Sequence, residues 1–330
     1  MTTTSPAASA LAQAANAAGL APSVFNTQPW RWRIFPERLE LHAERSRQLG
    51  VADPEGRLLT ISCGAALHHA RVALAAEGWE AVVVRLPEPQ DADLLARVSL
   101  GERSGVTNEA MRRYQALQVR RTDRRQLLDQ PVPPEALAEI RAAVEGEHNH
   151  LHLLHPEQVN DLSVAAARAD VLEATDSALR AEMAYWVGGR RPAGTGVPDT
   201  VIPTAPQTAG VPQRDLGRTG TMPSSPGTDR SATYAVIFGA EDSPVWWLRA
   251  GEALSAAWLV ASVHGVSVLP FSAPMEVSTT RMILRRLLAG VGHPYLVLRL
   301  GLVDPDEPAP PHPPRLAPTQ TVELAEPGRQ

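Results

Sequence analysis

The sequence predicts an α+β protein with two related halves, each built of antiparallel strands around a central buried helix. Two segments are apolar nearly all round, which is typical of helices in the middle of a core. Both contain the string Gly-x-Ala-Leu, starting at Gly64 in the first and at Gly251 in the second, and both end at a glycine, Gly78 and Gly265. Gly251 stands 187 residues after Gly64, and Gly265 stands 187 residues after Gly78. Each segment then leads into a short apolar strand. We therefore expect a duplicated unit, and two unrelated helix–strand units are the alternative.

The first half, residues 1–115, is expected to combine two helices with four strands. An alanine-rich segment that ends at a glycine predicts the first helix. Two runs of alternating apolar and polar residues, separated by Pro36-Glu-Arg38, predict two strands joined by a turn. In chain order we expect a helix over 6–19, strands over 30–35 and 39–43, the buried helix over 60–77, and strands over 79–86 and 96–100.

The second half, residues 116–330, repeats this arrangement with additions. Prolines at 133 and 134 suit the first turn of a helix, where their missing N–H is not needed. The string at residues 96–101 is echoed at 296–301, which supports a matching strand. We expect helices over 133–144, 159–186 and 251–263, strands over 150–154, 234–239 and 295–300, and an extended, proline-rich tail from Asp304.

The second half differs from a simple repeat of the first by an insertion at residues 188–230. It is rich in Gly, Pro, Thr and Ser and has no periodicity. Because a segment of this length is uncommon as an idle connection in a compact domain, it is either disordered or a functional lid.

Composition excludes several kinds of chemistry. All 31 basic residues are arginine, so a lysine Schiff base, a P-loop lysine and a Ser–Lys acylase are ruled out. The net charge of −5 argues against nucleic acid as a partner. The single Cys63 forbids an internal disulfide and fits the reducing cytoplasm. The N-terminus lacks the pattern of a signal peptide, and the apolar stretch 250–270 carries charges, so we expect a cytoplasmic protein that does not span a membrane.

The loop Ala21-Pro-Ser-Val-Phe-Asn-Thr-Gln-Pro-Trp30 groups neutral donors and acceptors beside aromatic rings. Ser23, Asn26 and Gln28 could meet the polar edges of a flat heteroaromatic ligand. A loop that merely ends a helix and enters a strand would also explain the string.

A second string, Arg120-Arg-Thr-Asp-Arg-Arg125, precedes the helix predicted from residue 133. Arginine forks and a threonine hydroxyl make a suitable cradle for a phosphate group. A solvated run of charges is the alternative.

Four histidines, at 148, 150, 152 and 155, follow a pattern in which the first three share one strand face. Zinc is conceivable there, but no carboxylate or cysteine stands at ligand spacing on that strand. We expect an exposed polar face and no metal site.

Together, the A-P-S-x-x-N-x-Q-P-W loop and the R-R-T-x-R string resemble the flavin-dependent nitroreductase superfamily, and more narrowly its single-chain, Acg-like branch. The resemblance covers nearly the whole chain and includes Pro270-Phe-Ser272 and Pro313-Pro-Arg315. It implies a nitroreductase-like fold in which two homologous halves, fused in one chain, replace a homodimer. Because the first half has the loop and the second half has the arginines, it also implies one complete FMN site. In the other site Glu145-Gly-Glu-His-Asn149 replaces the loop.

The resemblance assigns residues to FMN. The phosphate would contact Arg120, Thr122 and Arg315, and Arg124 would lie near the N1–C2=O edge of the flavin. The remaining contacts would come from Pro22, Ser23, Asn26, Gln28, Phe271 and Ser272. No side chain is expected to be catalytic, because the flavin carries the chemistry.

The implied function is an FMN-binding oxidoreductase that uses NAD(P)H to reduce a nitroaromatic, a quinone or a similar small aromatic acceptor. An FMN-sequestering protein with little turnover is the main alternative, and a binding protein for another planar phosphate is a third. The fusion removes the usual need to dimerise, so we expect a monomeric pseudo-dimer or a loose homodimer.

Overall fold

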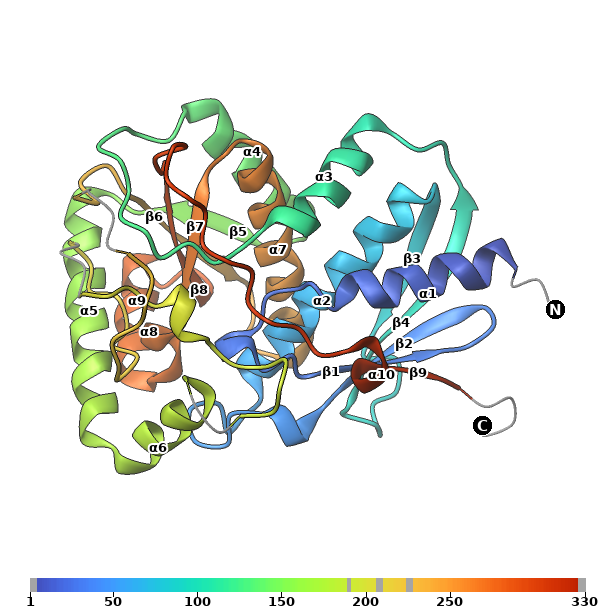
Figure 1. The fold of residues 1–330 in the computed structure, drawn as a ribbon, viewed down its shortest axis with the longest axis horizontal. Helices are drawn as coiled ribbons and strands as arrows, with labels where there is room; N and C mark the ends of the chain where they lie inside the picture. Colours follow the sequence, from blue (N-terminus) through green and yellow to red (C-terminus); the bar gives the residue numbers. More distant parts are fainter. Residues whose placement is uncertain (1–4, 189–190, 206–209, 224–227, 326–330) are drawn as a thin grey trace.

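A computed structural model describes residues 5–188, 191–205, 210–223 and 228–325 of the chain. These residues form two β-sheets with helices packed against them (Figure 1). The long helices α2 and α7 pack against each other between the sheets. The predicted α+β class is confirmed.

Four strands of the first sheet and the helices next to them come from roughly the first third of the chain. In order, the elements are α1 (Pro6–Ala18), β1 (Trp30–Ile34), β2 (Arg38–Ala43), α2 (Arg57–Ala76), β3 (Trp79–Arg85), β4 (Leu94–Arg103) and α3 (Asn108–Val119), with short 3₁₀ turns at Val24–Asn26 and Arg45–Arg47.

The second sheet follows with more helices around it. The elements from here on are α4 (Pro134–Gly146), β5 (His150–Leu153), α5 (Pro156–Thr175), α6 (Ser177–Trp186), a 3₁₀ turn at Asp199–Val201, β6 (Thr233–Gly239), α7 (Pro244–Val263), β7 (Ser267–Phe271), α8 (Ala273–Glu276), α9 (Ser278–Leu287), β8 (His293–Gly301), α10 (Pro318–Thr321) and β9 (Val322–Leu324). The last strand, β9, joins the first sheet.

The two sheets have the same strand order when the strands of each half are counted along the chain. Apart from β9, which lies next to β1 in the first sheet, the first sheet runs β1-β2-β4-β3 and the second β5-β6-β8-β7, so both read first, second, fourth, third. Both also carry a register shift between their second and fourth strands, at Leu41/His42 and at Ile237/Phe238. This agreement is compatible with two fused halves, whose boundary at residues 115–116 stays a prediction.

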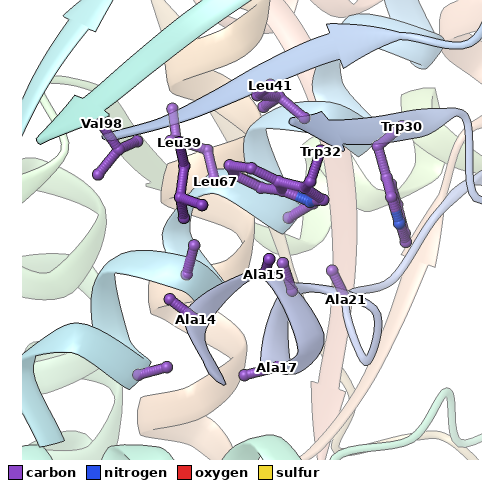
Figure 2. Packing of buried hydrophobic residues seen from close by; sticks show 14 of the residues in the cluster. Ala14, Ala15, Ala17, Ala21, Trp30, Trp32, Leu39, Leu41, Leu67 and Val98 are labelled. Atoms are coloured by element: carbon purple, nitrogen blue, oxygen red, sulfur yellow. The ribbon is translucent and has the colours of Figure 1, made fainter. Parts of the chain in front are cut away.

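The alternation of the β1 sequence explains which face of the first sheet is buried. Trp30 and Trp32 point from β1 toward the alanines of α1 and are fully buried, while Leu39 and Leu41 of β2 extend the same layer (Figure 2). Because alanine side chains are small, α1 can approach the two indole rings closely. Large aromatic rings bury the most apolar area per residue, and they anchor this core.

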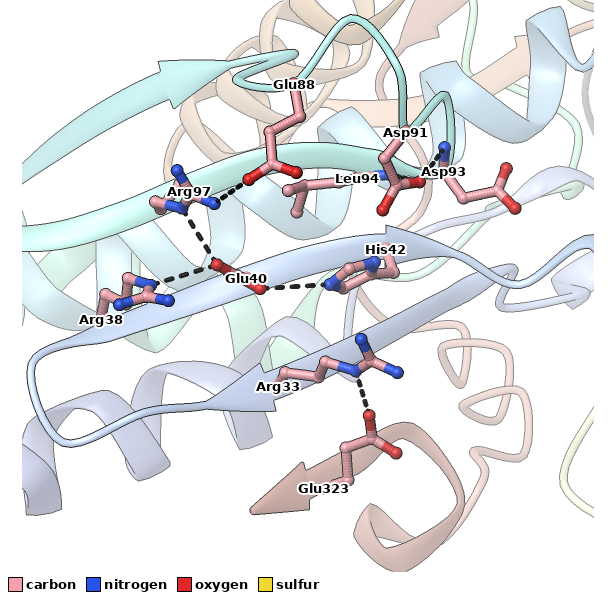
Figure 3. Close-up of polar contacts among 10 residues, drawn as sticks. All are labelled: Arg33, Arg38, Glu40, His42, Glu88, Asp91, Asp93, Leu94, Arg97 and Glu323. Carbon is pink, nitrogen blue, oxygen red and sulfur yellow. Dashed lines mark hydrogen bonds and ion pairs between the residues drawn. The ribbon is translucent and has the colours of Figure 1, made fainter. Parts of the chain in front are cut away.

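The opposite face of the first sheet carries charged side chains (Figure 3). Glu40 on β2 accepts hydrogen bonds from Arg38 and Arg97, at 3.1 and 3.0 Å. Burial raises the pKa of Glu40, but the two arginines lower it by more, so its pKa is below the usual value. An ion pair between Arg33 and Glu323 ties β1 to β9 on this face.

Helices α2 and α7 cross at the two glycines of the repeated string. A Cβ atom on Gly64 would lie 1.9 Å from the carbonyl oxygen of Leu248, and one on Gly251 would lie 1.9 Å from that of Ile61. The contacts are reciprocal, because Leu248 stands 187 residues after Ile61, as Gly251 does after Gly64. The backbones therefore touch at an approximate two-fold axis, and only glycine fits there.

Several element boundaries differ from the predictions. The helix expected over 159–186 is two helices, because Asp176 leaves the helical conformation and its side chain accepts hydrogen bonds from the N–H groups of Ala178 and Leu179. Such a cap ends one helix and starts another. Helices α2 and α7 begin three and seven residues earlier than expected, and α3, α8 and α9 were not predicted.

The C-terminal tail differs in a way that matters for the site. It was expected to be extended throughout, but it forms α10 and then β9, which pairs with β1 in parallel. The sheets are thus antiparallel with this one exception among the described strands. The tail returns from the second sheet to the first and joins them (Figure 1).

One helix in the described ranges, α2, is long and apolar enough to cross a membrane by length and composition. Most of it is buried inside the fold, where it packs against α1 and α7.

We predict that Gly64→Ala and Gly251→Ala each destabilise the protein by about 3 kcal/mol or more, because the added methyl group meets backbone that cannot move aside. Urea unfolding measures the change. Gly146→Ala is the control: it lies at the end of α4 with no atom within 4 Å of the added Cβ, so it should change stability by less than about 1 kcal/mol. Equal effects of the three substitutions would contradict the close crossing.

Candidate functional site

A cavity of about 740 Å³ is lined by residues from both halves. The first half contributes the loop after α1 and the start of α2, and the second half contributes the arginine string, α7, the end of β7, the 188–230 segment and the C-terminal tail. Nine of the ten predicted site residues line this cavity: Pro22, Ser23, Asn26, Arg120, Thr122, Arg124, Phe271, Ser272 and Arg315.

The loop after α1 has an unusual backbone. Phe25, Asn26 and Gln28 have φ angles of 44°, 54° and 52°, a left-handed conformation that residues other than glycine adopt rarely. Side-chain hydroxyl groups hold it: Ser23 Oγ accepts from the Gln28 N–H at 2.9 Å, and Ser62 Oγ accepts from the Val24 N–H at 3.2 Å. Strain of this kind persists where surrounding contacts enforce it, and it is concentrated at binding sites.

Asn26 and Gln28 connect this loop to distant segments. The Asn26 amide donates to the carbonyl oxygens of Gly196 and Pro314, and its oxygen accepts from Arg315 at 3.0 Å. The Gln28 amide donates to the Gly194 carbonyl at 2.7 Å and accepts from the N–H of Leu316. Gln28 does not line the cavity, so the geometry favours a structural role for it, and its contact with FMN stays a prediction without support here.

The arginine string is extended, so its side chains alternate. Arg120, Thr122 and Arg124 line the cavity, and the Asp123 N–H donates to the carbonyl of Val268 in β7. The odd-numbered arginines bind the tail instead: Arg121 donates to the Pro310 carbonyl at 2.8 Å, and Arg125 to the Glu307 carbonyl at 3.1 Å. The arginine string thus lines the cavity with three side chains and also binds the tail that carries Arg315.

Arg120 and Arg315 meet at the C-terminal end of α1. Both donate to the carbonyl oxygen of Leu20, at 2.8 and 3.0 Å, where the negative end of a helix dipole favours cations. Burial lowers the pKa of Arg120 far below its usual value, and the charge of Arg315 lowers it further. Burial also lowers the pKa of Arg315, to about 10. No carboxylate offsets either cation within the described ranges.

Both guanidinium groups have spare donors. Among the residues that the structure describes, Arg120 Nε and Arg315 Nε are buried and have no hydrogen-bond partner. A buried and a half-buried cation that share the Leu20 carbonyl oxygen, with donors left over, are suited to an anion with several acceptor oxygens.

Arg124 and the end of β7 form another part of the wall. Burial lowers the pKa of Arg124 to about 10, although neighbouring Asp123 acts in the opposite direction. Phe271 ends β7 and contacts the Tyr234 ring edge-on at 6.1 Å, and Ser272 follows at the start of α8.

The described part of the 188–230 segment is packed against the cavity. Val197, Val201 and Ile202 form a small apolar cluster with Phe25 of the loop. Arg214 lies 4.9 Å from the centre of the Phe25 ring and pairs with the buried carboxylates of Glu173 on α5 and Glu276 on α8. These contacts hold the segment as a cover over the cavity. Residues 189–190, 206–209 and 224–227 of the predicted lid lie outside the described residues.

The sequence reasoning did not single out Arg214 or Trp258 as site residues, although both line the cavity. Arg214 stood in a segment without periodicity, and Trp258 in a helix expected to be core. An arginine inside a segment rich in proline and glycine is a weak signal that could have identified Arg214 as a site residue.

Comparison with known proteins shows the family to which the chain is related. No family model matches the chain. The chain is 38% identical over 315 residues to "Putative NAD(P)H nitroreductase Rv3131" of Mycobacterium tuberculosis strain H37Rv, covering 93% of this chain and 89% of that protein. It is 30% identical over 298 residues to "Putative NAD(P)H nitroreductase acg" of the same strain, covering 89% of each. The chain belongs to the nitroreductase family.

Solved nitroreductases are more distant. The FMN and NADPH-dependent nitroreductase NfnB from sphigopyxis sp. strain HMH matches with a TM-score of 0.40 and 16% identity, covering 65% of this chain and 99% of that one. A nitroreductase with bound FMN from Bacteroides fragilis has a TM-score of 0.38 and 16% identity, covering 61% and 92%.

In this nitroreductase, ion pairs occupy the position related to the cavity by the approximate two-fold axis. Glu147, in the segment predicted to replace the loop, pairs with Arg71 of α2, and Arg71 pairs with the fully buried Glu252 of α7. Glu252 also accepts two hydrogen bonds from Arg85, at 2.7 and 2.9 Å. Next to them, His68 bonds to Ser255, again 187 residues later.

Two histidines on β5 of the second sheet contact neighbouring side chains. His150 lies against Phe238, and His152 bonds to Gln158 at 3.0 Å. In the described part of the chain, no group of three or more His, Cys, Asp or Glu residues is arranged to hold a metal ion.

We predict that Arg214→Gln in this nitroreductase releases the cover, because it leaves Glu173 and Glu276 buried without their cation, a change that costs roughly 3–5 kcal/mol. Limited proteolysis should cut residues 210–223 at least tenfold faster. The control is Arg218→Gln in the same segment, whose pair with Asp199 is more than a third exposed and is worth less than about 1 kcal/mol. Similar cleavage rates for both variants would argue against an Arg214 latch.

Proposed function

We propose that this nitroreductase binds FMN in the cavity between its halves and passes electrons from NAD(P)H to a small aromatic acceptor such as a nitroaromatic or a quinone. The observation that carries the proposal is the pair formed by the buried Arg120 and the half-buried Arg315, which have no neutralising carboxylate in the described part of the chain. Burying uncompensated charge is costly, so a site of this kind is built for an anionic ligand. The names of the relatives support the reductase class.

The residues present fit FMN. Arg120, Arg315 and the Thr122 hydroxyl would hold the phosphate, since they supply spare donors at one end of the cavity. Arg124 would place positive charge beside the ring, which favours an anionic reduced flavin. Pro22, Ser23, Asn26, Phe271 and Ser272 would line the ring and the ribityl chain. When bound, FMN supplies the hydride chemistry, and the protein supplies position and charge.

The cover favours a second candidate function. Arg214 holds the segment against α5 and α8, and Val197, Val201 and Ile202 close the cavity with apolar side chains. A cover held this firmly would hinder access of NAD(P)H and acceptor, as an FMN-sequestering protein requires. A monomer, or a loose homodimer, would serve either function, because segments from both predicted halves of one chain line the cavity.

The two functions differ in one measurement. We expect the purified protein to be yellow, and we expect anaerobic NADPH or NADH to bleach its absorbance at about 450 nm, the band of an oxidised flavin. A yellow protein that neither nucleotide bleaches would favour sequestration. A colourless protein that takes up no flavin would rule out both functions.

We predict that Arg120→Ala combined with Arg124→Ala abolishes flavin retention, because two cavity cations are lost and one charge-assisted phosphate contact contributes about 1.5–3 kcal/mol. Retained flavin is measured as the ratio of flavin absorbance to protein absorbance in the purified protein. The control removes the same charge from exposed helical positions, Arg112→Ala with Arg168→Ala, and should keep the colour. Stoichiometric FMN in the first variant would refute the phosphate assignment.

A further inference from the structure

Trp258 stands beneath Arg120 in the cavity wall. The guanidinium carbon of Arg120 lies 4.6 Å from the centre of the indole ring, within the range of a cation–π interaction. Trp258 is 2% exposed and Arg120 4% exposed, and both line the cavity. The contact is therefore shielded from water, where such interactions are strongest.

A buried guanidinium can be stabilised in two ways, with different consequences for a ligand. A carboxylate partner would stabilise Arg120 but would also cancel the charge that attracts a phosphate. The face of an indole ring and the Leu20 carbonyl carry only partial negative charge, so they stabilise the cation and leave its net charge intact. The unpartnered Nε of Arg120 fits this second arrangement.

The equivalent position in the other half shows the first arrangement. Arg71 of α2 stands 187 residues before Trp258 of α7, the same interval that relates Gly64 to Gly251. Arg71 is neutralised by Glu147, at 2.6 Å, and by Glu252, at 2.7 Å. At equivalent helix positions, therefore, α2 has a neutralised arginine on the side of the ion pairs. On the side of the cavity, α7 has an aromatic ring below an arginine that no carboxylate neutralises.

We propose that Trp258 is a positioning residue that determines the preference for a phosphorylated flavin, by holding Arg120 toward the phosphate without neutralising it. This inference rests on the proposed binding of FMN. It makes the indole ring part of the phosphate site, although the ring itself forms no bond to phosphate. If Trp258 merely filled the core, its substitution would instead weaken the binding of every flavin equally.

The test compares FMN with riboflavin, which has the same ring and ribityl chain but no phosphate. The flavin is removed from the full-length protein, and the dissociation constants of both ligands are measured by fluorescence titration for wild type, Trp258→Leu and Trp258→Phe. We expect Trp258→Leu to weaken FMN about tenfold and riboflavin less than about twofold, and Trp258→Phe to weaken FMN by a smaller factor. The control is Trp247→Leu on the same helix, whose ring lies 6.0 Å from Arg57 and outside the cavity lining, and which should change neither affinity.

A second comparison shows whether Trp258 acts through Arg120. In an Arg120→Gln background, Trp258→Phe should have no further effect on FMN affinity, because the cation it supports is gone. Equal weakening of both flavins, or a full additional loss in that background, would overturn the inference. If Trp258→Leu does not fold, Trp258→Phe is used for the same comparison of FMN with riboflavin, and a smaller but still selective loss of FMN affinity is expected. A wild-type protein that binds neither flavin would instead reject the proposed function itself.

Discussion

The crossing of α2 and α7 at Gly64 and Gly251 is the contact on which the rest of the structure depends. Because neither position has a side chain, the two backbones touch, and the sheets on either side are held at a fixed orientation. The cavity forms where the N-terminal turns of α2 meet α7 and the loop after α1 meets the arginine string. A side chain at the crossing would separate the helices, and with them the halves that supply the two ends of the proposed FMN site.

The same approximate symmetry has opposite outcomes on its two sides, and charge explains the difference. On one side, buried acids neutralise the arginines: Glu252 accepts from Arg71 and Arg85, and Glu147 completes the network. On the other side, Arg120 and Arg315 are stabilised by carbonyl oxygens and an aromatic ring, so their charge is available to a ligand. A buried ion pair is satisfied within the protein, whereas a buried cation without an acid is complete only when an anion binds.

Much of the fold and of the site could be predicted, because periodicity and motif spacing are local properties of a chain. The alternation around Trp30 and Trp32 identified the buried strand face. The two strings contributed six residues of the cavity, and the family resemblance added Phe271, Ser272 and Arg315. The contributions of Arg214, Trp258 and Asp176 could not be predicted, since each depends on a partner distant in sequence or on a local cap inside an apparently helical run. The strand β9 is three residues long, and its pairing with β1 is a tertiary contact that no local pattern records.

The C-terminal tail shows how these distant contacts combine. Arg121 and Arg125 bind its backbone from one side, Asn26 and Gln28 bind it from the other, and β9 fixes its end on the first sheet. Arg315 lies between these anchors, so both halves determine its position. The strained loop after α1 therefore does more than line a cavity: its left-handed residues orient Asn26 to hold the arginine that completes the cation pair. The cost of that backbone strain is offset by contacts that exist only when tail, loop and cover are assembled together.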